Sequence, residues 1–218
     1  DISWYDENAA EMVIESREDL YGLYIMSQHN SFKGKTIKLG ADIIVNEGNA
    51  SAWAEKAPEN EWIPIDNFRG KFDGVGHTIS GLYMNEGENC CTGFFLRALD
   101  AEIKNVQFTN CYMRGVNRQG QSIVAALFRG TMDSVYADGI LEVHVDDEGD
   151  VQAGGLIGLA LGESAIKNCW FDGTITTNGR KFGGIIGTNI TRTDAKVSIE
   201  NSLVTGTLNC KNSGNSVV

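Results

Sequence analysis

The chain of 218 residues is long enough to bury a large apolar core within one domain. Its 29 acidic and 18 basic side chains give a formal charge of −11, so its surface repels phosphate, which excludes nucleic acids and anionic lipids as partners. A hydrophobic content of 42% excludes disorder, and 26 glycines beside 2 prolines predict many tight turns. The longest nearly apolar run, residues 154–162, is far shorter than the roughly 20 residues of a membrane-spanning helix, so we expect no membrane insertion of this segment.

The first predicted element is an amphipathic helix from about Arg17 to His29. Ser16 precedes acidic residues, as an N-cap residue does, and Leu20, Leu23 and Ser27 recur at helical spacing. Strand-like pieces follow at residues 36–39, 62–65 and 78–82. We expect residues 1–92 to form an N-terminal cap and the first irregular coils of the fold.

From residue 93 onward the sequence repeats itself. Similar segments begin at Gly93, Ala126, Gly155 and Gly184, in steps of 33, 29 and 29 residues. Each unit holds about three short apolar pieces of strand length, separated by Gly, Asn or Asp, and none has the spacing of a helix. A period of roughly 29–33 residues over 93–218 therefore predicts repeated coils of strands.

A second echo begins at Ile103, Met132, Ile166 and Ile199. A unit of this size cannot bury its own apolar side, but stacked units can, because each strand then pairs in parallel with its copy about 4.8 Å away. We therefore expect these four side chains to form one interior column.

Polar positions echo in the same way. Asn105, Asn168 and Asn201, with Ser134 as the exception, should stack at a bend, where a short polar side chain tolerates a left-handed backbone. The pairs Gly154-Gly155 and Gly183-Gly184 suit corners that have no room for a Cβ atom. The sequence predicts an all-β fold: one continuous right-handed parallel β-helix (solenoid) with an N-terminal amphipathic capping helix.

Several runs resemble the GLUG-motif β-helix modules of bacterial proteins. The opening of these modules is similar to residues 32–43 (FKGKTIKLGADI), 62–65 (WIPI) and 68–82 (FRGKFDGVGHTISGL), and the motif itself is similar to residues 155–158 (GLIG) and 184–187 (GIIG). The resemblance covers residues 15–209. The final glycine of the motif is replaced at Phe95-Leu96-Arg97 and Phe128-Arg129, so irregular coils are expected there.

Such modules occur in large secreted or cell-surface proteins, including the non-catalytic region of immunoglobulin A peptidases. The resemblance therefore implies a non-enzymatic scaffold or adhesion module, located outside the cell or at its surface. It implies a host or cell-surface protein or glycan as partner, and further domains of the same chain. Because the sequence opens at Asp1 without signal-type or closing features, we also expect a fragment of a longer protein.

No catalytic pattern or cofactor motif is readable in the chain. The three histidines fit neither HExxH nor a Ser/His/Asp arrangement, and His77 is expected to be a structural turn residue. The five cysteines match neither a metal site nor a disulfide framework, so we expect most of them to fill the interior. The chain is therefore predicted not to be an enzyme, with no cofactor.

The densest acidic cluster gives an alternative. Asp146, Asp147, Glu148 and Asp150 lie in a predicted loop and could ligate Ca²⁺, although the spacing is not that of an EF-hand. Some β-helices are polysaccharide lyases or hydrolases that use clustered carboxylates, and a loss of turnover in Asp147→Ala would support that function. An acidic turn is commonplace in a chain of this charge, and no metal site is the favoured interpretation.

The tryptophans give a second alternative, a carbohydrate-binding module. Exposed indole faces stack on sugar rings, and the chain has Trp4, Trp53, Trp62 and Trp170. Trp53 is the preferred candidate because it lies in the polar loop 46–61, which is longer than a turn requires. Trp62 is expected to be buried.

Overall fold

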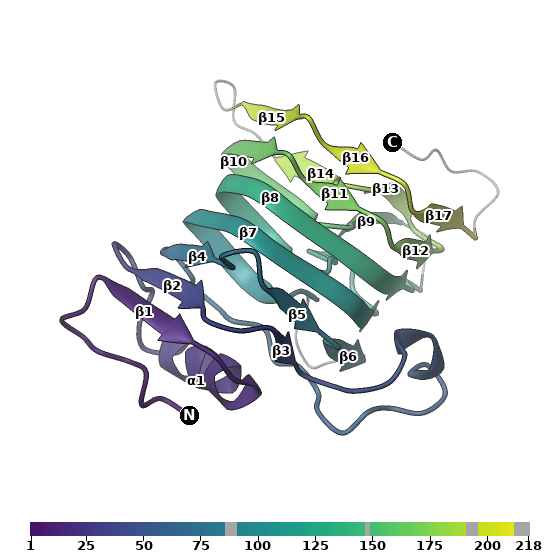
Figure 1. The fold of residues 1–218 in the computed structure, drawn as a ribbon. Coiled ribbons are helices and arrows are strands. Elements are labelled where there is room, and N and C mark those ends of the chain that lie inside the picture. Colours follow the sequence, from purple (N-terminus) through teal and green to yellow (C-terminus); the bar gives the residue numbers. More distant parts are fainter. Residues whose placement is uncertain (86–90, 147–148, 191–195, 212–218) are drawn as a thin grey trace.

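The computed structural model describes residues 1–85, 91–146, 149–190 and 196–211. Its strands are stacked as successive coils, with the N-terminus at one end of the stack and the last described strands, within residues 197–210, at the other (Figure 1). Every strand pairing within it is parallel, and the main sheet has the order β1-β2-β4-β7-β8-β10-β14. The chain is an all-β parallel β-helix, as predicted.

The elements before residue 93 are short. They are β1 (Glu11–Ile14), α1 (Arg17–Ser27), β2 (Thr36–Leu39), β3 (Ile43–Ile44), the 3-10 helix η1 (Ala50–Ala52), β4 (Lys71–Asp73), β5 (Thr78–Ser80) and β6 (Tyr83–Asn85). The predicted strand at 62–65 is wrong, because Ile65 makes only an isolated bridge with Phe95. The same main sheet includes β1, β2 and β4, so the first coils join the later ones without a break.

Later strands are longer and continue around the bends of the coil. They are β7 (Phe95–Gly115), β8 (Ala125–Val143), β9 (Asp150–Gly154), β10 (Ile157–Lys167), β11 (Trp170–Phe171), β12 (Thr174–Thr177), β13 (Arg180–Gly183), β14 (Ile186–Ile190), β15 (Val197–Glu200), β16 (Leu203–Val204) and β17 (Thr207–Cys210).

The helix α1 closes the N-terminal end of the core. It begins with a capping box, in which Ser16 Oγ accepts from the backbone N–H of Asp19 and Asp19 Oδ2 accepts from that of Ser16, both at 3.1 Å. Leu20 and Leu23 are fully buried in the same apolar cluster as the inward residues of β1. The helix ends at Ser27, two residues before the predicted end.

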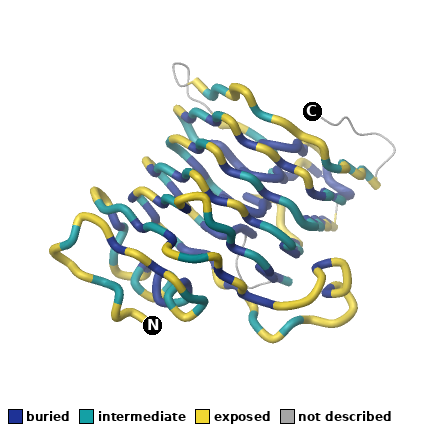
Figure 2. Tube along the Cα trace, in the orientation of Figure 1, coloured by how far each residue is buried: buried dark blue, intermediate teal, exposed yellow. Residues whose placement is uncertain are grey.

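The predicted interior column is confirmed. Ile103 is the register partner of Met132, Met132 of Ile166, and Ile166 of Ile199. The first three are fully buried, whereas Ile199 is 49% exposed because no described strand stacks on the last coil. Figure 2 shows this change as dark blue interior positions that give way to yellow ones in the final coil. Toward the N-terminus the column continues through Phe72, Ile37 and Met12.

The polar bend is confirmed as well. Asn105, Ser134, Asn168 and Asn201 all have a left-handed backbone, with φ of 52°, 57°, 53° and 48°. Asparagine is enriched in this conformation, which most side chains avoid. Each coil therefore turns at the same place by the same backbone conformation.

One alignment of the repeats is wrong. Ala125 is the register partner of both Phe95 and Ile157, so the segment equivalent to Gly155 begins at Ile123 and not at Ala126. The steps are then 30, 32 and 29 residues. Residues 123–128 are apolar throughout and contain no glycine, so nothing in the sequence marked where the segment starts.

The irregular coil expected at 95–97 is wrong, because β7 and β8 keep one register from Phe95 to Leu99. The irregularity expected at 128–129 is present on the other side of β8, where its pairing with β10 shifts register between Phe128 and Gly130. Further register shifts follow Leu99 and Phe108 in β7.

Candidate functional site

The outer face of the coil carries an alternating column of charges. Residues that are register partners from coil to coil have opposite signs, and we call this column the charge ladder: Lys38, Asp73, Lys104, Asp133, Lys167 and Glu200. Neighbouring strands lie about 4.8 Å apart, so each charge is flanked by opposite charges at short range. The ladder stabilises the stacking without adding net charge.

The bend asparagines tie into this ladder. Asn105 Nδ2 donates to Asp73 Oδ1 at 3.1 Å, and Asn168 Nδ2 donates to Asp133 Oδ1 at 2.9 Å. The bonds from Asn168 and Ser134 lower the pKa of Asp133 below its usual value, because they favour the charged carboxylate. These polar groups are used to hold coil to coil.

Trp53 does not present an open indole face. It is 5% exposed and meets Tyr83 edge-on, with ring centroids 6.1 Å apart, while Tyr83 stacks on Tyr112 at 5.7 Å. These residues form a small apolar cluster, separate from the main core, with Ala50. Trp53 thus anchors the 46–61 loop, and its predicted role in ligand binding stays a prediction.

The same loop encloses a cleft of about 500 Å³ against the start of α1. Arg17, Asn46, Trp53, Lys56 and Glu59 are among the residues that line it. Two cations and two acidic side chains, with several amides, give it a balanced set of donors and acceptors. Such a lining suits a polar ligand that carries little net charge.

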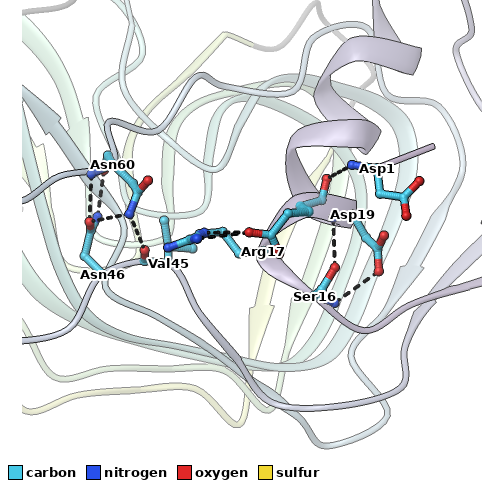
Figure 3. A network of polar contacts seen from close by, with 8 residues as sticks. Asp1, Ser16, Arg17, Asp19, Val45, Asn46 and Asn60 are labelled. Carbon is cyan, nitrogen blue, oxygen red and sulfur yellow. Dashed lines mark hydrogen bonds and ion pairs between the residues drawn. The ribbon is translucent and has the colours of Figure 1, made fainter. Parts of the chain in front are cut away.

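An amide pair fastens the two ends of the loop. Asn46 Nδ2 donates to the Asn60 carbonyl at 2.7 Å and to the Gly81 carbonyl at 2.9 Å, while Asn46 Oδ1 accepts from the Asn60 N–H at 2.9 Å. Figure 3 shows this pair beside Val45, with Arg17 between it and the helix N-cap. Because the ends are fixed, the cleft exists before any ligand arrives.

The acidic cluster is only partly described. Asp147 and Glu148 lie outside the described residues, and Asp146 is exposed. Asp150 accepts a hydrogen bond from Lys181 Nζ at 2.5 Å, which lowers the pKa of its carboxyl group, and it lies 3.6 Å from Arg180 Nε. Within the described ranges, no three His, Cys, Asp or Glu side chains are arranged to hold a metal ion. The absence of a metal site stays a prediction, and calcium binding at these residues stays its alternative.

The reactive residue types have structural positions. His77 Nδ1 lies 3.1 Å from Asp42 Oδ1, which also accepts from the Thr78 N–H at 2.9 Å, so His77 belongs to a turn as expected. Cys91, Cys111 and Cys169 are buried, as predicted for interior fillers. Burial raises the pKa of the Cys169 thiol to about 11.

The most exposed tryptophan is one that the sequence analysis did not single out. Trp170 is 41% exposed on the outside of β11, whereas Trp62 is fully buried, as expected. The signal was present: Phe171 follows Trp170 and faces inward, so alternation along a strand places Trp170 outward. Without the register, Trp170 could not be matched to its neighbours.

Comparison with known proteins defines the class. Residues 149–176, which contain Gly155-Leu156-Ile157-Gly158, match the family described as "Glug: The GLUG motif". Gly154 and Gly155 leave no room for a Cβ atom, as predicted: one on Gly154 would lie 2.0 Å from the carbonyl oxygen of Ile157, and one on Gly155 would lie 2.3 Å from that of Gly184. The chain is therefore a parallel β-helix in which residues 149–176 match the GLUG motif.

Two individual proteins resemble it. Halomucin of Haloquadratum walsbyi is 26% identical over 189 residues, which cover 81% of this chain but only 2% of halomucin. A Bacteroides ovatus protein assigned as an immunoglobulin A1 protease has the same fold, with a TM-score of 0.56 and 18% identity over 95% of this chain and 73% of that one. Motif, relative and fold together fit a module of a surface or secreted protein. No helix within the described residues is long and apolar enough to cross a membrane.

Proposed function

We propose that the chain is a non-enzymatic module of an extracellular or cell-surface protein, in which it acts as a rigid spacer and an adhesive scaffold. The observation that carries the proposal is the interior column, in which each residue from Met12 to Ile199 is the register partner of the next. A stack of this kind is rigid along its axis and presents long outer faces to a partner.

The polar residues support the same role. Five carboxylates are paired with cations or amides of neighbouring coils: Asp66, Asp73, Asp100, Asp133 and Asp150. Groups committed in this way stabilise the scaffold. The partner we propose is a host or cell-surface protein or glycan, which the scaffold contacts through its loops and outer faces.

The test is an adhesion assay on the folded chain. Beads coated with the chain should attach to immobilised mucin or to fixed epithelial cells more strongly than beads coated with the heat-denatured chain. Parallel assays should find no cleavage of pectin, polygalacturonate or mucin glycans. Attachment equal to that of the denatured control, or turnover of any of these polymers, would contradict the proposal.

A second candidate function is carbohydrate binding in the cleft of the 46–61 loop. The preformed cavity and its donors and acceptors favour it. Lys56→Ala removes a cation from the lining, and Lys33→Ala removes an exposed lysine outside it. On a glycan array, a signal that falls in the first variant and persists in the second supports this candidate, and equal signals contradict it.

A further inference from the structure

Three apolar side chains lie side by side on the outside of the coil. Trp170 of β11 is the register partner of Tyr136 of β8 on one side and of Leu203 of β16 on the other. Trp170 is 41% exposed, Leu203 is 51% exposed and Tyr136 is half-buried. In Figure 1 these strands run next to one another near the C-terminal end. We call this strip the aromatic ledge.

The orientation of the indole in the ledge is fixed by hydrogen bonds. Trp170 Nε1 donates to Thr205 Oγ1 at 2.7 Å, and Thr205 Oγ1 donates to Asp172 Oδ1 at 2.7 Å. On the other side, the Tyr136 ring lies 4.9 Å from the indole at an angle of 63°. Because the one polar atom of the indole is already bonded, the part of Trp170 left to a ligand is ring carbon.

Acceptors flank this apolar surface. The Tyr136 hydroxyl donates to Asp138 Oδ2 at 3.0 Å, and Asp172 is exposed. Asp172 Oδ1 accepts from Thr205, and within the described part of the chain its Oδ2 has no partner. A pyranose ring has the complementary chemistry, since its C–H groups form an apolar face and its hydroxyl groups are donors at the edge.

The shape of the ledge favours a sugar chain over a protein surface. The strip takes one side chain from each of three coils, and beside it only Val204, at the end of the last described coil, adds exposed apolar surface among the described residues of β11 and β16. The charge ladder lies on the other side of the bend, at Lys167 and Glu200. A stable protein interface needs about 800 Å² on each partner with an apolar centre, which three side chains do not supply. The acidic rim and the charge of −11 disfavour uronates and sulfated sugars.

From these observations we infer that Tyr136, Trp170 and Leu203 bind a neutral oligosaccharide, with a pyranose ring stacked on Trp170 and its hydroxyl groups directed to Asp172. The site is separate from the cleft of the 46–61 loop. The inference rests on the proposed adhesive function in one respect, namely that the partner of the chain is a glycan.

The test is calorimetric titration of the full chain with cellohexaose, xylohexaose, chitohexaose and mannohexaose, with polygalacturonate as the anionic comparison. We expect saturable binding of at least one neutral oligosaccharide at millimolar concentration and no binding of polygalacturonate. Trp170→Ala should weaken that binding about fivefold to tenfold, as expected for the loss of one stacked ring. Trp170→Phe, which keeps an aromatic face, should retain most of it.

Two controls keep the result interpretable. Ile25→Ala removes an exposed apolar side chain of α1, far from the ledge, and should bind as the unmodified chain does. Thermal unfolding of each variant, followed by circular dichroism, identifies any variant that does not fold. If Trp170→Ala does not fold, the deciding comparison is between Trp170→Phe, which should keep most of the binding, and Trp170→Leu, which should lose it.

Several results would overturn the inference: no neutral oligosaccharide binds the folded chain, polygalacturonate binds better, or Trp170→Ala and Trp170→Leu bind as the unmodified chain does. The inference would also be overturned if a protein bound the chain through Trp170 and the oligosaccharides did not compete with that protein for binding. The bead assay remains independent, because attachment can persist through a protein partner when the ledge binds no sugar.

Discussion

Asn168 donates a hydrogen bond from Nδ2 to Asp133 Oδ1 at 2.9 Å, although the two residues lie in successive coils. Asn168 has a φ of 53°, and its backbone turns the coil while its side chain joins the neighbouring coil. One residue type thus meets two requirements, a left-handed backbone and a short donor, which explains why asparagine recurs at this bend.

Replacing Asn168 should separate these two contributions. Asn168→Ala loses the hydrogen bond and places a Cβ-bearing residue without a polar side chain in the left-handed region, so the free energy of unfolding should fall by about 2 kcal/mol. Asn168→Gly loses only the hydrogen bond and should cost about 1 kcal/mol. Urea titration of both variants provides the comparison. If alanine were tolerated as well as glycine, backbone strain would not explain the bend.

The interior column provides a matched pair of substitutions. Ile166 is fully buried between two neighbours, whereas Ile199 is half exposed in the same column. Ile166→Ala should lower the free energy of unfolding by about 2–5 kcal/mol, because it leaves a cavity in a packed core. Ile199→Ala should cost about 1 kcal/mol or less, since much of the side chain is already in water. Denaturant unfolding measures both, and equal losses would contradict the assignment.

The glycine corner can be tested in the same manner. A Cβ atom on Gly155 would lie 2.3 Å from the Gly184 carbonyl oxygen and 2.4 Å from the Phe171 ring, so Gly155→Ala should cost about 3 kcal/mol or prevent folding. Gly34 is the matched control: its φ is 78°, but a Cβ atom there would have no heavy atom within 4 Å. Gly34→Ala should therefore cost only about 1 kcal/mol of backbone strain. In thermal unfolding, Gly155→Ala should therefore have a lower melting temperature than Gly34→Ala, and the reverse order would contradict the assignment.

The pH dependence of stability should include a contribution from Asp100. Its carboxylate accepts hydrogen bonds from Arg129 Nε at 2.7 Å and from Arg69 Nη2 at 2.5 Å, and these bonds hold the pKa of Asp100 below its ordinary value of 3.8. The folded chain therefore favours the charged form. The stabilisation is fully present above the unfolded pKa and is lost as the pH falls through the folded one.

Asp100→Asn tests this contribution without disturbing the backbone, since Asp100 has a φ of 57° and asparagine tolerates that conformation. The carboxylate is 46% exposed, so solvent screening limits the expected loss at neutral pH to about 0.5–1 kcal/mol. Stability curves of the variant and the unmodified chain should converge below the folded pKa of Asp100. If the stability difference between the variant and the unmodified chain were the same at every pH, the contribution of Asp100 would not be ionic. High salt should reduce the difference if it is ionic.

Much of the fold could be predicted from sequence because the signals were repeated. The echo at Ile103, Met132 and Ile166 gave the correct register, and the bend asparagines gave the correct backbone conformation. Where the marker was missing, prediction failed. Residues 123–128 contain no glycine, so the start of that segment was placed three residues too late.

The candidate sites were harder to predict because they depend on which residues face each other. Trp53 lies in a long polar loop, yet it is buried against Tyr83, whose position depends on a coil far along the chain. Alternation with Phe171 indicates that Trp170 faces outward, but no local pattern reveals that Tyr136 and Leu203 are its neighbours across strands. The cleft of the 46–61 loop and the aromatic ledge could therefore be identified only once the register between coils was known.

The central claim is that successive coils lie in register, and disulfide trapping measures this directly. Ala165 is the register partner of Thr131, and Lys167 of Asp133. The double variant Thr131→Cys with Ala165→Cys should oxidise readily, with the bridge between positions 131 and 165 mapped by peptide mass spectrometry, because paired Cα atoms lie within bridging range. The control variant Thr131→Cys with Lys167→Cys is offset by two residues and should not form a bridge. Efficient trapping of the offset pair, with none of the matched pair, would contradict the stacked-coil account.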